Sequence, residues 1–115
     1  LQAGGYESQR SGVSQARLVA AAPGRWCVSG VLDFATAPHL AEEGARLLGQ
    51  MGRADRVEID LSGVELANSA GLALLLEWME LADRHGVRLT YLHLPDSLRR
   101  IAAFSNLQDL LPTGG

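Results

Sequence analysis

The sequence predicts one α/β domain, built on a small sheet of mixed strand direction with helices packed on it. Residues 56–61 alternate strictly between apolar and polar side chains, as in a strand with one buried face. Residues 69–85 repeat apolar side chains at helical spacing. The expected order is strand, strand, helix, strand, helix, strand, helix. Its two strand–helix–strand passages require crossover connections and parallel pairing.

The composition limits the classes of protein to which the chain can belong. The 115 residues suit one domain with its own core, and a hydrophobic content of 47% is too high for a disordered chain. The formal net charge of -3 argues against binding of nucleic acid through bulk positive charge. The cationic residues are all Arg, which we attribute to codon bias rather than to function.

The cysteine and apolar patterns indicate a cellular compartment. A single cysteine, Cys27, excludes an intrachain disulfide and a Cys-rich metal site, and favours a reducing environment. No apolar stretch approaches the roughly 20 residues of a membrane span, and the N-terminus lacks a signal-peptide pattern. We therefore expect a cytoplasmic protein without direct membrane insertion.

The first third of the chain predicts a lead-in and a hairpin. Residues 1–15 are rich in Gly, Ser and Gln without periodicity, and we expect them to form a flexible lead-in to a domain over residues 16–111. Strands are predicted at residues 18–22 and 26–32, with a turn at Pro23-Gly24 between them.

The remaining elements follow from helix signals and strand patterns. A helix is expected to begin with Thr36 as its N-cap and Pro38 in its first turn, and to end with Gly52 as its C-cap. After the strand at 56–61 we expect, in order, a connection at 62–68, a long helix at 69–85 closed by Gly86, a strand at 87–94, a helix from Pro95 to about Phe104, a docked turn at 107–111 and a frayed end at 112–115.

The long helix carries two apolar stripes when it is laid out at 100° per residue. The first stripe should face the sheet and contains Leu72, Leu75, Leu76, Met79 and Ala82. The second contains Leu74, Trp78 and Leu81, and it needs either the neighbouring helix or another protein to cover it. We favour a division in which part of this stripe touches the first helix and Trp78 reaches a partner, because Trp is enriched in binding hot spots.

The start of this helix and the end of the second strand are candidate binding positions. In the ordinary interpretation Asn68 caps the helix, Ser69 fills its first turn, and Asp33 is a turn or capping residue ahead of Thr36. A helix start also collects free N–H groups and the positive end of the helix dipole. The small Ala70 and Gly71 leave room for a partner backbone beside them.

Motifs for catalysis or for cofactors are missing from the sequence. The histidines His39, His85 and His93 fall in separate elements without metal-ligand spacing. Ser69 lacks the G-x-S-x-G elbow of hydrolases, and no P-loop or dinucleotide-binding glycine pattern occurs. We therefore expect no catalytic residue, no metal and no cofactor.

Two segments together resemble the STAS domain, the fold of bacterial anti-sigma-factor antagonists. They are residues 30–37, Gly-Val-Leu-Asp-Phe-Ala-Thr-Ala, and residues 59–72, which contain Asp60-Leu61-Ser62-Gly63 and Asn68-Ser69-Ala70-Gly71. The resemblance covers residues 17–111 and implies a STAS-like sheet. Residues 71–76, followed by Leu81-Ala82 and residues 84–86, are similar to the MlaB-type subgroup, also called toluene-tolerance proteins.

The MlaB-type resemblance implies a non-catalytic subunit of a Mla-type ABC transporter, which moves phospholipid and maintains outer-membrane lipid asymmetry. It implies that the chain binds the cytoplasmic ATPase subunit, and through it the permease, at the periphery of the inner membrane. The implied partner-binding residues are Asn68, Ser69, Ala70, Gly71, Leu74 and Trp78, with Asp33 as a rim contact.

The more distant resemblance leaves an alternative function open. In the antagonists an Asp precedes a phosphorylatable Ser at the start of the long helix, and the matching positions here are Asn68 and Ser69. The alternative is therefore an anti-sigma-factor antagonist regulated by phosphorylation of Ser69. A small-ligand STAS module is a weaker third hypothesis, because no convergent set of polar residues indicates a pocket.

Overall fold

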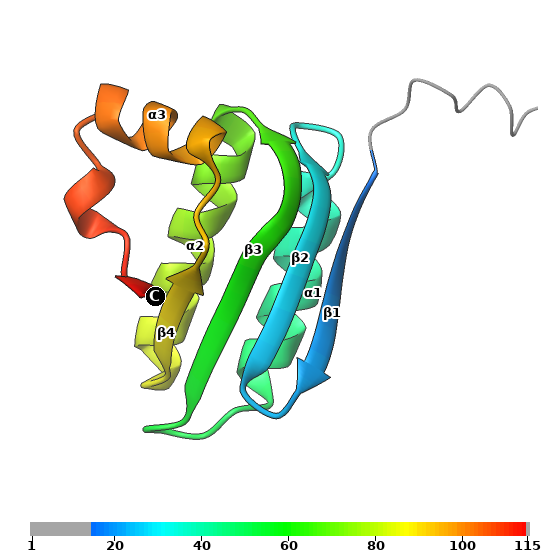
Figure 1. The fold of residues 1–115 in the computed structure, drawn as a ribbon. Coiled ribbons are helices and arrows are strands. Elements are labelled where there is room, and N and C mark those ends of the chain that lie inside the picture. The colour runs from blue at the N-terminus through cyan, green and yellow to red at the C-terminus, as the bar shows by residue number, and fades with distance from the viewer. Residues whose placement is uncertain (1–14, 115) are drawn as a thin grey trace, which may run out of the picture.

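The computed structural model describes residues 15–114, so nearly all of the expected lead-in at 1–15 lies outside it. It contains a five-stranded sheet in the spatial order β1-β2-β3-β4-β5, in which β1 and β2 are antiparallel and the other neighbours are parallel. The elements (Figure 1) are β1 (Ala16–Ala22), β2 (Arg25–Leu32), α1 (Ala37–Gly49), β3 (Arg56–Ala67), α2 (Ser69–His85), β4 (Arg88–Leu92), α3 (Asp96–Phe104), a 3-10 turn η2 (Gln108–Leu110) and β5 (Thr113–Gly114). The predicted mixed α/β architecture and the order of its first seven elements are confirmed.

Helices α1 and α2 lie side by side on one face of the sheet, and the other face is open (Figure 1). The alternation in β3 explains this arrangement, because Val57, Ile59 and Leu61 are fully buried beneath the helices, whereas Arg56 and Glu58 are exposed on the open face. Helix α3 packs against α2 near the N-terminal end of that helix.

The boundaries of α2 agree with the sequence, whereas two other boundaries do not. Helix α2 spans Ser69–His85 and ends at Gly86, which adopts a left-handed conformation at φ 71°. Helix α1 ends at Gly49 with Gln50 as its C-cap, before the expected Gly52. The expected connection at 62–68 is instead mostly a continuation of β3, made possible by Gly63, where a Cβ would lie 2.8 Å from the Ser29 Cβ on β2.

Residues 112–114 are more ordered than the expectation of a frayed end at 112–115, of which residue 115 lies outside the described residues. The Tyr91 N–H donates to the Pro112 carbonyl at 2.8 Å, and Tyr91 and Leu92 pair with Thr113 and Gly114 as parallel strands. A pair this short leaves no apolar periodicity in the sequence, so the pattern could not predict it.

The second stripe of α2 is covered by α1, which overturns the prediction that Trp78 reaches a partner. The Trp78 side chain has 0% exposure and its ring meets Trp26 edge-on at a centroid distance of 5.9 Å. Gly44 of α1 makes room for it, since a Cβ at Gly44 would lie 2.5 Å from Trp78 Cε2. Trp78 is therefore a core residue of the α1–α2 interface, and its side chain is not available to a partner.

Candidate docking site

The carboxyl ends of β2 and β3 bring the two candidate segments together. Leu32 pairs with Ala67, and the Asn68 N–H donates to the Leu32 carbonyl at 3.0 Å. Asp33 follows Leu32 directly, so the structure places it beside the start of α2. Parallel neighbouring strands cause this proximity, because their carboxyl ends meet at one edge of the sheet.

The start of α2 is capped as expected. The Asn68 Oδ1 accepts a hydrogen bond from the Ala70 N–H at 2.8 Å. Ser69 is exposed, and its hydroxyl makes no hydrogen bond within residues 15–114. Gly71 is buried, with an added Cβ 3.0 Å from Leu32 Cβ, so its small size serves the packing of α2 on this chain's own sheet. The expected room for a partner backbone beside Gly71 is therefore taken by this chain's own sheet, whereas Ser69 is exposed.

The loop before α1 is a tight turn held by Asp33 and Thr36. The Asp33 Oδ1 accepts from the N–H groups of Ala35 and Thr36, at 2.9 and 3.1 Å. The Thr36 hydroxyl donates to the Val31 carbonyl at 2.8 Å, so this side chain closes the turn and does not cap α1, contrary to the prediction. The turn leaves the Phe34 ring 72% exposed.

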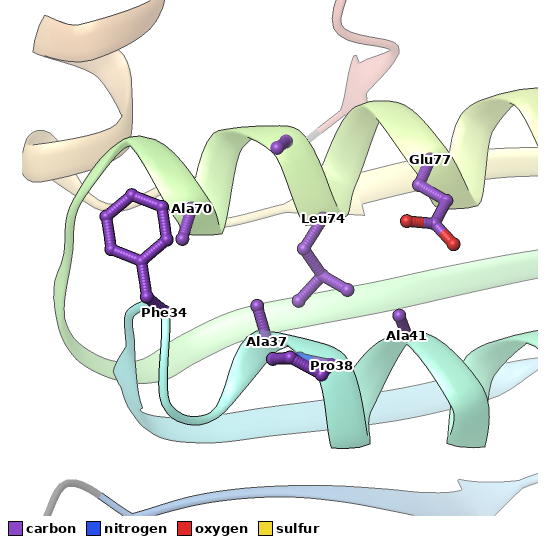
Figure 2. Close-up of a pocket in the computed structure, with 8 residues that line it drawn as sticks. Phe34, Ala37, Pro38, Ala41, Ala70, Leu74 and Glu77 are labelled. Atoms are coloured by element: carbon purple, nitrogen blue, oxygen red, sulfur yellow. The ribbon is translucent and has the colours of Figure 1, made fainter.

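An apolar groove of about 360 Å³ opens between the first turns of α1 and α2 (Figure 2). Most of its lining side chains are small, and Figure 2 shows the Phe34 ring beside Ala70 at one end and the Glu77 carboxylate on the α2 side nearer Ala41. Leu74 is only 2% exposed but points into the groove from α2. The lining consists of Phe34, Ala37, Pro38, Ala41, Ala70, Ala73, Leu74 and Glu77.

The groove contains several residues that the sequence analysis did not select. Phe34 stands within the segment that carries the STAS resemblance, and an aromatic residue in a loop of a chain with 5% aromatics was a usable signal. The contribution of α1, through Ala37 and Ala41, depends on how the helices are placed side by side, which periodicity does not reveal.

The chemistry of the groove suits a protein side chain better than a small molecule. A small-ligand site normally combines its apolar wall with several placed polar groups. Here Glu77 is the charged side chain among the described residues that line the groove. In the described part of the chain, no group of three or more His, Cys, Asp or Glu residues could hold a metal ion.

The titratable group with a lowered pKa lies outside the groove. The Ser62 N–H donates to Asp60 Oδ1 at 2.9 Å and this hydrogen bond, assisted by the Ser62 side chain, His93 and Arg25, lowers the pKa of Asp60. Asp60 lies on the open face of the sheet, where Arg25 approaches it at 3.7 Å. Asp60 pairs with Cys27 at the point where the register of β2 and β3 shifts, and we assign it a structural role there.

Comparisons with known proteins agree with this geometry. The sequence profile of a family described as "Mlab, STAS domain" matches residues 17–112. An anti-sigma factor antagonist from Mycobacterium paratuberculosis superposes with a TM-score of 0.69 at 25% identity, covering 86% of this chain and 85% of that one. SpoIIAA, an anti-sigma factor antagonist in its unphosphorylated form, has a TM-score of 0.66 at 16% identity, covering 88% and 89%, and shares the fold. No curated protein matches the sequence significantly.

The profile match covers most of the chain, from the second residue of β1 to two residues beyond the end of η2. The solved antagonists share the same arrangement of sheet and helices. Within residues 15–114, no helix is both long and apolar enough to cross a membrane. The chain therefore belongs to the STAS domain family, in the group described as MlaB.

Proposed function

We propose that this chain is the non-catalytic STAS subunit of a Mla-type ABC transporter for phospholipid, and that it binds the cytoplasmic ATPase subunit. The match to the MlaB group supports this function. The observation that carries the choice of surface is the apolar groove at the start of α2, which the exposed Phe34 lines. The exposed Ser69 directly precedes Ala70, another residue of the lining. The chain would reach the permease and the inner membrane only through the ATPase.

The proposed contact uses apolar burial at the groove and hydrogen bonds at its edge. Burying the Phe34 ring removes apolar area from water, and aromatic anchors of this kind dominate many interfaces. The exposed Ser69 hydroxyl is free to bond with a partner group. Binding only the folded ATPase would stabilise that subunit by mass action, which gives a subunit without catalytic groups a regulatory effect.

Copurification with a Mla-type ATPase from the same organism tests the proposal. We expect a stoichiometric complex with the unchanged chain, and its loss in a Phe34→Ser, Ser69→Arg double variant. Leu66→Ser is the matched control, because Leu66 is also exposed, at 59%, but lies on β3 outside the groove. A double variant that copurifies as well as the control would refute the docking surface.

A second candidate function is an anti-sigma-factor antagonist switched by phosphorylation of Ser69. It is supported by the 25% identity to a solved antagonist and by the exposure of Ser69 at the first turn of α2. A phosphate there would add about 1.5 to 2 negative charges where the helix dipole favours them. Incubation with a serine kinase encoded nearby should then add one phosphate to the chain but not to Ser69→Ala, and an unchanged mass would reject this function.

A further inference from the structure

The two phenylalanines of this chain are both on its surface, although phenylalanine is usually buried. Phe34 is 72% exposed beside the groove, and Phe104 is 93% exposed at the last position of α3. The two tryptophans, Trp26 and Trp78, are buried at 4% and 0% exposure. The fold has therefore placed its larger aromatic rings in the core and left the phenylalanine rings available for contact.

The end of α3 carries an apolar ring next to an unpaired cation. Arg100 precedes Phe104 by four residues, so the two side chains share one face of the helix, whereas Leu98 and Ala102 face the core. Arg99 approaches Asp96 at 3.7 Å, but Arg100 forms no ion pair with any residue that the structure describes. The exposed face of α3 thus offers one aromatic ring and one cation for contact with another surface.

The groove is complementary to this face of α3. Its wall is apolar and made mostly of small side chains, which leaves space for one aromatic ring, and Phe34 supplies a second ring at its mouth. Glu77 lies in the lining and has no ion-pair partner among residues 15–114. The groove therefore offers an apolar space and an unpaired anion, where α3 offers an apolar ring and an unpaired cation.

We propose that the groove of one copy of this chain binds Phe104 of a second copy, with Arg100 of the second copy beside Glu77. The contact is between copies, since Phe104 at 93% exposure does not fill the groove of its own chain. This contact joins two different patches of the surface. It can therefore link copies into an open chain, or form twice within a reciprocal dimer. It needs no other protein, and self-association would compete with the proposed ATPase for the same groove.

The association is expected to be weak and sensitive to salt. One aromatic anchor buries less area than a stable interface needs, and a solvent-exposed ion pair contributes little free energy. Sedimentation should therefore be measured from about 10 μM to about 1 mM chain, at low and high salt. We expect the weight-average mass to rise with concentration, and to rise less at high salt.

Matched variants test the two halves of the contact. Phe104→Ser should raise the dissociation constant at least about tenfold, whereas Val19→Ser, at another exposed apolar position on β1, should leave it unchanged. Glu77→Arg and Arg100→Glu should each weaken association and restore it when combined in one chain. Arg99→Ala is the control for the loss of an arginine from α3.

A mixing experiment separates this contact from general stickiness. Ala73→Arg blocks the groove at an exposed position, and Phe104→Ser removes the ring, so each variant alone should remain monomeric. Their mixture should form a one-to-one complex, in which the first variant provides Phe104 and the second provides the groove. A monomeric wild-type chain at all concentrations, or unchanged association in Phe104→Ser, overturns the proposal without bearing on the ATPase complex.

Discussion

Replacing Gly44 by Ala tests whether Trp78 is a core residue of the α1–α2 interface. Gly44 lies in the middle of α1 and is buried, and a Cβ there would overlap Trp78 Nε1 and lie 2.5 Å from Cε2 and 2.9 Å from Cδ1. The indole is 0% exposed and Trp26 meets it edge-on, so a displacement of its ring disturbs other core side chains. The added methyl group must therefore push the two helices apart or force Trp78 off its rotamer.

The size of the effect follows from two opposed contributions. Overpacking a well-filled interface costs about 1–3 kcal/mol, whereas replacing a helical glycine with alanine gains up to about 1 kcal/mol. Gly49 is in the same helix and has nothing within 4 Å of an added Cβ, so Gly49→Ala reports the helical gain without the overlap. We expect Gly44→Ala to lower the free energy of unfolding by about 1–3 kcal/mol relative to Gly49→Ala.

Urea unfolding, followed by tryptophan fluorescence and by circular dichroism, measures this difference. Coincident transitions and an unchanged m-value are needed before the free energies of unfolding are compared. If Gly44→Ala is as stable as Gly49→Ala, the indole is able to vacate the interface, and our explanation of the glycine is wrong. In that case Trp78 would become available again as a docking residue.

Further predictions at three residues concern hydrogen bonds and ionisable groups. Tyr91→Phe removes the 2.6 Å hydrogen bond from the buried hydroxyl to the Leu75 carbonyl, and should lower the free energy of unfolding by about 0.5–1.5 kcal/mol in urea titrations. Burial raises the pKa of Tyr91 well above 10.0, so this hydroxyl ionises at a lower pH in the unfolded chain than in the folded one. The free energy of unfolding should therefore fall as the pH rises above 10.0, and it should fall less in Tyr91→Phe. Asn68→Ala should cost about 1 kcal/mol, and an unchanged urea midpoint would contradict the cap. The lowered pKa of Asp60 stabilises the fold above pH 3.8 and that stabilisation is lost in acid, so Asp60→Asn should show a smaller stability loss than wild type between pH 5 and pH 2.

The sequence was sufficient to predict features that depend on residues close together in the chain. The cap at Asn68 and the left-handed Gly86 define both ends of α2 independently of the rest of the fold. The alternation at residues 56–61 placed the buried face of β3 correctly. Such features depend on neighbours a few residues apart, which a sequence displays directly.

Features that depend on distant neighbours were predicted less well. The extension of β3 to Ala67 depends on Gly63 meeting Ser29 of β2, and β5 depends on Pro112 accepting from Tyr91. Whether Trp78 is exposed depends on Gly44, which lies on another helix. The helical wheel identified the second stripe, but only the placement of α1 shows which protein surface covers it.

The burial of Trp78 changes which side chains can supply the energy of docking. The stripe of Leu74, Trp78 and Leu81 appeared as an apolar surplus of α2, yet α1 covers most of it, so it cannot be counted again at an interface. The remaining large apolar group at the groove is Phe34, which the Asp33 turn holds outward. An anchor on a rigid turn loses little conformational entropy on binding. Phe34, rather than Trp78, is therefore the residue whose removal should most weaken the binding of a partner at the start of α2.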